Sequence, residues 1–506
     1  MSKMIIKILD KIKAGLHEVS INADRLHLIL SASHPPFKDP RIQWESVYSN
    51  NTDAFLCIGL HSDRTKKMSM VLQRKNVVEL SAFNNSPLSK NNCLKNIWHK
   101  KSLMVQPQIL LLKKLLYKSD AYFSKEYGIP SDRINNFRSY CKYFYRSSKI
   151  LADIGLSFSR ISTVIAADLD SLLPALILKA HYGVPVVYDA HETWPEAFCD
   201  FSDAEVKFWT DFEGSLLKHV DEQFTVSPVI ASYMQDKYKS YFKVLPNCVP
   251  LSSSILLEDK PRRTRNSPCI FLYQGNIAKH RGLELLINAW KHTLTDAKLI
   301  IRAPITNIDH IEQLKLLSGH LLGQKIFFDA PVTEDELVLK ASEAHVGLIP
   351  YQPIGMNHLG CCPNKLSQYL AAGLPVISNE LPFIRSVIES GQCGVVVDFS
   401  KAYDLAAVID SFANDPKLVE RLSLNAHQYF LSEFNWEKQS KVFFDSIRHL
   451  SIIIPTSRTV FHYEEGGIKF SKLAGDFAVK ILSIIKRKIK GCCTRFILKF
   501  NTYGCD

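Results

Sequence analysis

The stretch Pro363–Asn379, PNKLSQYLAAGLPVISN, decides the fold because it holds a helix, a sharp stop and a buried strand. A proline suits the first position of a helix, where its missing N–H is no loss, and Leu366 and Leu370 follow at helical spacing. Gly373 fits the left-handed residue after the helix, and Pro375 blocks its continuation. The pattern predicts a loop-helix-strand unit of an α/β domain.

The segment 354–360 leads into this helix as a flexible loop. A helix N-terminus presents unpaired N–H groups and a partial positive charge, which suits a diphosphate. Taken alone, the loop with the helix and strand that follow it is equally well explained as an ordinary loop-helix-strand unit of an α/β domain.

Length and composition bound the rest of the chain. Its 506 residues exceed one typical domain, and an apolar content of 46% supports two cores with appendages. No uncharged apolar run reaches the roughly 18 residues that a membrane-spanning helix needs. Charges interrupt the apolar segment 1–20, which predicts a short amphipathic helix rather than a secretory signal.

Cysteine usage and charge bound the partners. The 12 cysteines lack metal-ligand spacing and indicate a reduced, cytoplasmic protein. The net charge of +12 fits an anionic partner, whether a nucleotide, a lipid surface or a nucleic acid.

The first α/β elements are a strand at Leu26–Ser31, a helix from about Ile42 and a strand at Ala54–Ile58. The loop after the first strand carries four polar residues: His34, Lys38, Asp39 and Arg41. Because open α/β sheets bind ligands at the carboxyl ends of parallel strands, these residues are site candidates. The alternative is that they are only solvated loop residues.

The polar, basic stretch 62–148 is expected to be an insertion of one strand and some helices on the first domain. Its aromatic residues form either a basic, adhesive face or part of the core. The large area that aromatic side chains bury favours the core.

The α/β pattern returns with strands at Thr163–Ala166 and Val186–Tyr188, joined by a helix. Such strands are parallel with a right-handed crossover, which brings Asp168 and His191 to one sheet edge. A carboxylate and an imidazole there can orient or deprotonate a hydroxyl nucleophile. Equally, His191 can be a structural residue bonded to Asp189 or Glu192. The spelling Asp168-Leu169-Asp170 also resembles a DxD metal motif, but a match of three letters is too common to indicate one.

The polar run 258–268 is predicted to link two domains. Strands and helices alternate again from Cys269, which predicts a second doubly wound parallel sheet. The strands expected are Cys269–Gln274, Lys298–Arg302, Lys325–Asp329, Val346–Pro350, Leu374–Ser378 and Val395–Asp398. Arg281, in the loop after the first of them, either pairs with a diphosphate as a charged donor or forms a surface salt bridge.

An ordered set of motifs resembles the GT-B glycosyltransferases of family 4. The set is DPRI (39–42), DLDSLLPA (168–175), VVYDAHETWPE (186–196), FTVS (224–227), LPN (245–247), YQGN (273–276) with RGLELLINAW (281–290), and PNKLSQYLAAGLPVIS (363–378). The resemblance covers about Leu26 to Leu450, apart from the insertion. It implies two Rossmann-like domains that face each other across a cleft, and transfer of a sugar with retention at the anomeric carbon, without a metal.

The resulting domain organisation has five parts: a Rossmann-like acceptor domain at 1–257, a linker at 258–268, a Rossmann-like nucleotide-sugar domain at 269–431, a terminal helix at 432–450 that returns toward the first domain, and a tail at 451–506. The tail has an apolar helical face, with Phe477 and Ile481, surrounded by lysines. Basic amphipathic helices of this kind lie on anionic bilayers, so we expect attachment to the inner face of the membrane. The alternative is a helix docked on the protein's own surface.

The residues and the resemblance together give the candidate site. The donor-binding set is Gly275, Asn276, Arg281, Asn364, Lys365 and Gln368. The catalytic set is Asp168, His191 and Arg281, and the N-terminal loop adds His34, Asp39 and Arg41. No metal or other cofactor is expected, and a UDP- or GDP-linked sugar is the co-substrate.

The chain departs from the family at its phosphate and ribose ligands. Family members commonly carry an Arg and a Lys where this chain has Asn276 and Arg281, so phosphate binding depends more on Arg281. The two EX7E glutamates correspond to Gly360 and Gln368. A glutamine amide can bond ribose hydroxyls, but without the strength of a carboxylate, so weak activity or none stays open.

The leading interpretation is a retaining glycosyltransferase that moves a sugar to a glycan or lipid-linked acceptor in the synthesis of polysaccharide or another cell-envelope glycan. One alternative is a nucleotide-sugar epimerase, which shares the two-domain architecture. Another is a non-catalytic, glycosyltransferase-like partner. No nucleic-acid partner is expected.

Overall fold

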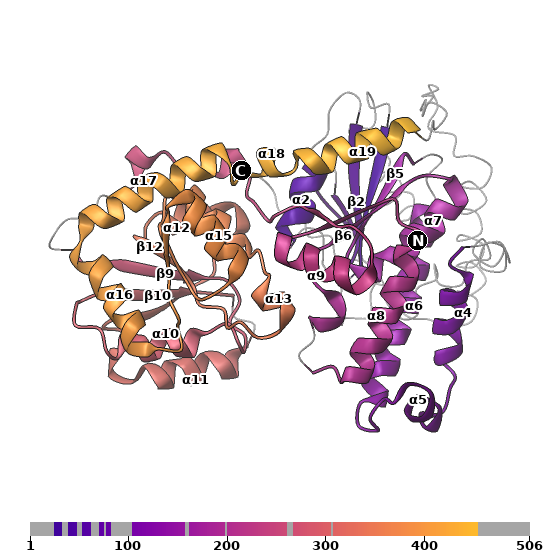
Figure 1. Cartoon of the computed structure of the whole chain (residues 1–506), viewed down its shortest axis with the longest axis horizontal. Coiled ribbons are helices and arrows are strands. Elements are labelled where there is room, and N and C mark those ends of the chain that lie inside the picture. The colour runs from indigo at the N-terminus through magenta and orange to yellow at the C-terminus, as the bar shows by residue number, and fades with distance from the viewer. Residues whose placement is uncertain are drawn as a thin grey trace, which may run out of the picture. The chain divides into compact units, whose positions relative to one another are not determined.

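The structure is a computed structural model that describes residues 25–32, 39–47, 53–61, 70–74, 77–81, 104–156, 161–197, 200–260, 267–304 and 307–453. It contains two compact units, Met1–Phe224 with Asp445–Asp506, and Thr225–Phe444 (Figure 1). The predictions for His34 and for the tail beyond Ile453 lie outside the described residues.

The first unit contains β1 to β6 and nearly all of β7 from an eight-stranded sheet, in the order β3-β4-β2-β1-β5-β6-β7-β8. The strands of this sheet are β1 (Arg25–Ser31), β2 (Asp53–His61), β3 (Met70–Arg74), β4 (Val77–Ser81), β5 (Thr163–Ala167), β6 (Val186–Ala190), β7 (Glu222–Thr225) and β8 (Lys243–Val244). Strand β1 pairs in parallel with β2 and β5, β5 with β6, and β2 with β4, whereas β3 is antiparallel to β4. Strand β5 is buried throughout, as expected of a parallel strand covered on both faces.

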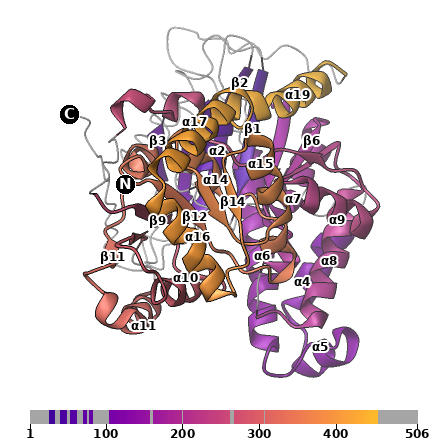
Figure 2. The same ribbon diagram turned by 60° about the vertical axis from the view of Figure 1, so that its left-hand side comes forward.

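The helices of the first unit pack in a layer against this sheet. They are α2 (Pro40–Val47), α4 (Gln106–Leu115), α5 (Asp120–Tyr127), α6 (Ile134–Gly155), α7 (Leu169–Tyr182) and α8 (Asp203–Leu217), with the 3-10 helix η3 (Trp194–Glu196). Helix α6 contacts α4 and α7, and α4, α6 and α8 lie side by side in Figures 1 and 2. Phe123, Phe137 and Phe144 are fully buried, which confirms the core interpretation for these three rings.

The stretch 62–148 takes part in both layers of the first unit. Its described residues hold two strands, β3 and β4, where one was expected, and β4 pairs directly with β2. Helix α6 runs without a break from Ile134 to Gly155. These elements therefore extend the sheet and its helical cover.

The second unit contains a fully parallel six-stranded sheet in the order β11-β10-β9-β12-β13-β14. Its strands are β9 (Ile270–Gln274), β10 (Lys298–Arg302), β11 (Ile326–Asp329), β12 (Val346–Ile349), β13 (Val376–Ser378) and β14 (Gly394–Val396). Every predicted strand is present, within two residues at each end. The parallel sheets of the two units confirm the predicted doubly wound fold class.

Helices cover this second sheet in two groups. The α-helices of this unit are α9 (Pro228–Tyr238), α10 (Leu283–Trp290), α11 (Ile308–Ser318), α12 (Leu337–Ala341), α13 (Gly355–Leu359), α14 (Asn364–Ala371), α15 (Pro382–Gly391), α16 (Ala402–Asn414), α17 (Pro416–Ser432) and α18 (Trp436–Gln439). The 3-10 helices are η4 (Leu251–Ser253), η5 (Leu257–Asp259), η6 (Gly319–Leu321) and η7 (Glu334–Glu336). Helix α10 contacts α11 and α16 (Figure 1). Helix α14 contacts α12 and α17.

The segment Pro363–Asn379 folds nearly as its residues predict. Pro363 is the residue before helix α14, one position earlier than expected, and Gly373 adopts the predicted left-handed conformation with φ of 59°. The preceding segment is not an open loop, because it contains the short helix α13.

The last described helix is α19 (Lys441–Ile453), whose final part belongs to the first unit. There Ser451 Oγ lies 3.2 Å from Thr163 Oγ1 at the start of β5. Within the described part of the chain, no helix combines the length and apolar character needed to cross a bilayer.

Candidate functional site

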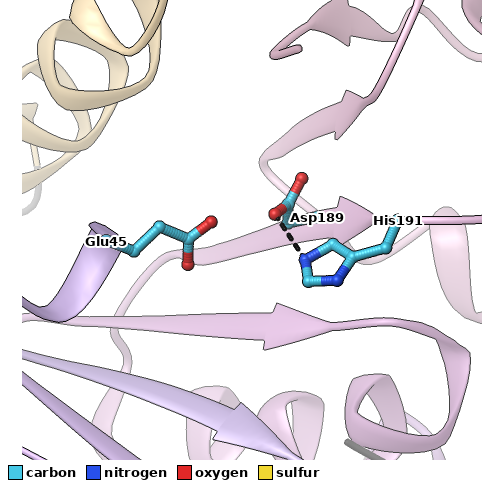
Figure 3. A group of neighbouring side chains, drawn as sticks. All are labelled: Glu45, Asp189 and His191. Carbon is cyan, nitrogen blue, oxygen red and sulfur yellow. Dashed lines mark hydrogen bonds and ion pairs between the residues drawn. The ribbon is translucent and has the colours of Figure 1, made fainter. Parts of the chain in front are cut away.

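The first unit gathers charged side chains where neighbouring parallel strands end. Asp168 follows β5, Asp189 lies in β6, and His191 comes directly after it. Arg41 and Glu45 stand on α2, the helix that follows β1. Figure 3 shows the Glu45 carboxyl group facing Asp189, which bonds to the His191 ring. This is the sheet edge at which ligands of open α/β sheets bind.

A buried ion pair joins α2 to β6. Arg41 Nε donates to Asp189 Oδ2 at 2.7 Å, and Arg41 Nη2 donates to Oδ1 of the same group. Burial alone would raise the pKa of Asp189, but the charges of Arg41 and His191 lower it below its usual value. Burial and the neighbouring Asp189 charge raise the pKa of Glu45 well above its usual value. At neutral pH, Asp189 is therefore ionised, and its charge disfavours ionisation of the neighbouring Glu45.

His191 is held by three carboxylates. Its Nε2 lies 2.9 Å from Asp189 Oδ2, its Nδ1 lies 3.4 Å from Asp39 Oδ2, and its backbone N–H donates to Asp168 Oδ1 at 2.9 Å. Burial alone would lower the pKa of His191, but the charges of Asp168, Asp189 and Asp39 raise it well above the usual value. A protonated imidazole donates hydrogen bonds, so this ring suits contact with a sugar oxygen better than removal of a proton.

The two aspartates of the Asp168-Leu169-Asp170 spelling serve different partners. Asp168 has a φ of 61°, a conformation that non-glycine residues rarely adopt, and it binds the His191 backbone. Asp170 is buried and accepts a 3.0 Å hydrogen bond from the Tyr143 hydroxyl. The spelling therefore does not mark one shared ligand group.

Three side chains of this edge have the spacing of a metal site. Possible ligand atoms of Glu45, Asp189 and His191 all lie within 4.8 Å of one another. However, Arg41 already neutralises both oxygens of Asp189. The arrangement favours an ion-pair network over a bound cation.

The second unit holds a buried cation at the start of α14. Lys365 is 5% exposed, and its Nζ makes no hydrogen bond with any described residue. This atom lies 3.8 Å from the centroid of the Tyr273 ring and 4.7 Å from that of Tyr351. Burial and the charge of Arg281 lower the pKa of Lys365 well below its usual value.

Three further donor candidates surround this lysine. The Arg281 guanidinium stacks on Tyr351 at 4.1 Å from the ring centroid. A Cβ on Gly275 would lie 3.1 Å from Lys365 Nζ, so glycine makes room for the ammonium group. The Asn276 carbonyl accepts a 2.6 Å hydrogen bond from Tyr273, while its side chain is exposed.

The arrangement in the second unit is suited to an anion. Two cations lie near the N-terminus of α14, and Asn364 is the first residue of that helix. The helix has no side-chain cap, and its terminus carries partial positive charge. Because a buried, unpaired ammonium group is costly, a bound diphosphate would relieve strain that the free protein carries.

The two positions that depart from the EX7E pattern are explained by their neighbours. A Cβ on Gly360 would lie 2.7 Å from Ile230 Cδ1, so a glutamate there requires the Ile230 side chain to move. Gln368 is 4% exposed. Its Oε1 accepts a hydrogen bond from Gln274 Nε2 at 2.9 Å, and its Nε2 donates to Glu334 Oε1 at 3.3 Å.

Sequence reasoning missed several members of both clusters. They are Glu45 in the first unit, and Tyr273, Gln274, Glu334 and Tyr351 in the second. The position of Gln274 at the end of β9 was the signal available, since parallel strands carry site residues at their carboxyl ends. The bond between His191 and Asp189, which the sequence offered as a structural alternative, is present in the structure.

Comparison with known proteins places the second unit in context. Residues 257–429 match the family model described as Glycosyl transferases group 1. The glycogen synthase of Mycobacterium tuberculosis is 25% identical over 281 residues, which cover 52% of this chain and 63% of that protein. The alpha-D-kanosaminyltransferase of Streptomyces kanamyceticus is 23% identical over 175 residues, covering 34% and 41%. The chain thus spans less than two thirds of the length of these relatives.

Solved structures resemble a larger part of the chain. The sucrose-phosphate synthase of Thermosynechococcus elongatus has a TM-score of 0.60 at 15% identity, covering 85% of this chain and all of that one. Anabaena HepE, solved in complex with UDP and glucose, has a TM-score of 0.59 at 12% identity, covering 84% and 100%. The fold is therefore that of the GT-B glycosyltransferases, and residues 257–429 carry the match to the glycosyl transferases of group 1.

Proposed function

We propose that this chain is a retaining glycosyltransferase that takes a sugar from a UDP- or GDP-linked donor and passes it to a glycan or lipid-linked acceptor in cell-envelope glycan synthesis. The observation that carries the proposal is the buried Lys365 ammonium group, which makes no hydrogen bond with any described residue and lies at the start of α14. The match of residues 257–429 to group 1 glycosyl transferases supports it. So does the fold likeness to HepE, which was solved with UDP and glucose.

The residues of the second unit act on the leaving group. Lys365, Arg281 and the N-terminus of α14 stabilise the negative charge that develops on the diphosphate as the sugar leaves. Because these groups supply positive charge, the reaction is expected to proceed without a metal. Addition of EDTA should leave the rate of sugar transfer unchanged, and a loss that Mg²⁺ restores would contradict this part of the proposal.

The residues of the first unit act on sugar hydroxyls. His191, whose Nε2 is bonded to Asp189 and whose pKa the surrounding carboxylates raise, donates a hydrogen bond from Nδ1 to an oxygen of a bound sugar. Asp39 accepts the backbone N–H of Arg41 at 3.0 Å and fixes the start of α2 beside this ring. Asp168 orients the same histidine through its backbone.

The basic tail from residue 454 supports a location at the membrane surface, where a lipid-linked acceptor lies. Sedimentation with phosphatidylglycerol vesicles tests this part of the proposal. The full chain should sediment with these vesicles and not with phosphatidylcholine, and a chain that ends at Ile453 should stay in the supernatant. Equal behaviour of the two chains would remove the membrane from the proposal.

The central experiment is a titration with UDP, GDP and their sugar conjugates, followed by thermal unfolding. A ligand that binds only the folded protein raises the melting temperature. The shift should occur with one nucleotide class, disappear in Arg281→Ala and persist in Glu312→Gln, which alters an exposed pair with Lys315. Transfer of labelled sugar from that nucleotide to membrane glycans would then establish the activity. No shift with any nucleotide would favour a non-catalytic partner.

A further inference from the structure

Gln368 lies in a chain of three polar side chains in the second unit. Gln274 Nε2 donates to Gln368 Oε1 at 2.9 Å, and Gln368 Nε2 donates to Glu334 Oε1 at 3.3 Å. Gln274 ends β9, Gln368 stands in the second turn of α14, and Glu334 opens η7 after β11. The hydrogen bonds thus connect three separate segments near the carboxyl ends of the strands.

The chain of bonds fixes the orientation of each group. Gln274 is 2% exposed and Gln368 4%, so neither amide can turn freely. Since Gln274 occupies the Gln368 oxygen, the Gln368 amide nitrogen is directed to Glu334. The exposed Glu334 is the charged member of the chain, so the acceptor strength of a carboxylate is present although residue 368 is an amide.

One atom of the chain also points to a ligand. Gln274 Oε1 is buried and makes no hydrogen bond with any described residue. A buried acceptor without a partner is costly. A ligand that carries hydroxyl donors would satisfy it together with the carboxylate.

The spacing along α14 suggests which part of the ligand lies there. Gln368 follows Lys365 by one helical turn, which places the two side chains on the same face, about 5–6 Å apart at their Cβ atoms. In a nucleoside diphosphate the ribose is joined directly to the diphosphate. A diphosphate at Lys365 would therefore bring ribose hydroxyls to the Gln368 and Glu334 pair.

We propose that Glu334 is the carboxylate that binds the ribose hydroxyls of the donor nucleotide, and that Gln274 and Gln368 position it. This inference depends on the proposed function, because it assigns a specificity residue within the same donor site. It also accounts for a glutamine at position 368, since the negative charge is supplied from η7 rather than from α14.

Calorimetric titration of the full chain tests the inference. The first probe is UDP or GDP, whichever raises the melting temperature more. The others are the 2′-deoxy and 3′-deoxy forms of that nucleotide, and inorganic pyrophosphate. Glu334→Gln should weaken binding of the ribonucleotide about 10- to 100-fold, the range of one hydrogen bond to a charged group. Pyrophosphate affinity should not change. The deoxy form that lacks the hydroxyl bound by Glu334 should bind the wild type weakly, and it should bind Glu334→Gln with the same affinity. Glu312→Gln is the control, as an exposed glutamate on α11 of the same unit.

The pair of variants at 334 and 368 gives a second, independent test. Gln368→Glu alone places two carboxylates side by side and should weaken nucleotide binding by repulsion. Combined with Glu334→Gln, it restores one carboxylate and one amide, and affinity should recover to within a few-fold of the wild type.

The outcomes are distinguishable. The inference is overturned, while the proposed function stands, if Glu334→Gln binds the ribonucleotide as well as the wild type does. The same holds if the variant loses as much affinity for pyrophosphate as for the ribonucleotide. If the wild type binds no nucleotide, the proposed function fails and the inference fails with it.

Discussion

The Nε2 atom of His191 lies 2.9 Å from Oδ2 of Asp189, the same oxygen that accepts a 2.7 Å hydrogen bond from Arg41 Nε. One buried carboxylate oxygen therefore serves two cations from two different segments. The arrangement ties the end of β6 to α2 and fixes the face that the imidazole presents.

The first prediction concerns the pH dependence of stability at His191. The carboxylates around this ring outweigh its burial and raise its pKa in the folded protein above the value of the unfolded chain, about 6.5. Its contribution to stability is therefore fully present below about pH 6.5 and is lost as the pH rises through the folded pKa. The difference in unfolding free energy between wild type and His191→Gln should shrink as the pH rises above about 6.5. Urea unfolding at several pH values measures it, and a constant difference would contradict the assignment.

The second prediction concerns the ion pair of Arg41. Arg41→Met leaves Asp189 as a buried charge that has lost its main partner, which typically costs about 3–5 kcal/mol of unfolding free energy. Arg385→Met is the matched control, because Arg385 pairs with Glu380 and Glu389 at the surface. This substitution should lower the free energy of unfolding by less than about 1 kcal/mol. Chemical unfolding measures the free energy of unfolding of both variants. Equal losses for Arg41→Met and Arg385→Met would disprove the buried pair.

The strands and the segment around α14 could be predicted from the sequence because their signals are local. Buried apolar runs predicted β1, β5, β9 and β10 to within two residues, and Gly373 predicted the left-handed stop. These patterns depend only on residues close together in the chain.

The charge states of the site could not be predicted in this way. The pKa of His191 depends on Asp39, Asp168 and Asp189, which come from three separate segments of the chain. Likewise, the link from Gln274 to Glu334 through Gln368 exists only once β9, η7 and α14 are packed. The sequence named Gln368 as a departure from the family, but it did not show which carboxylate lies beside it.

The third prediction concerns Gly282, which precedes α10 and follows Arg281. Its φ is 77°, and an added Cβ would lie 1.9 Å from the Pro350 carbonyl oxygen. Gly282→Ala should destabilise the protein by more than about 2 kcal/mol and weaken nucleotide binding, because the backbone at Arg281 must shift. Gly323→Ala has nearly the same φ, 75°, with no atom within 4 Å, so it isolates the conformational strain. It should cost about 1 kcal/mol and leave binding unchanged. Similar losses for both variants would show that the contact with Pro350 is not limiting.

The fourth prediction separates stability from binding at Lys365. Burial and Arg281 lower the pKa of this lysine in the folded protein, so the unfolded chain binds more protons and the stability contribution of Lys365 rises with pH. Lys365→Met removes the buried amine, which lies over the rings of Tyr273 and Tyr351, and leaves an apolar side chain in its place. The variant should be at least as stable as the wild type near neutral pH, and the stabilisation by nucleotide should be lost. In the wild type, a bound diphosphate raises the pKa of Lys365, so proton uptake on binding should be larger than in Lys365→Met, and calorimetry in buffers of different ionisation enthalpy measures the difference. A variant that is less stable and still binds nucleotide would show that the lysine serves the fold and not the ligand.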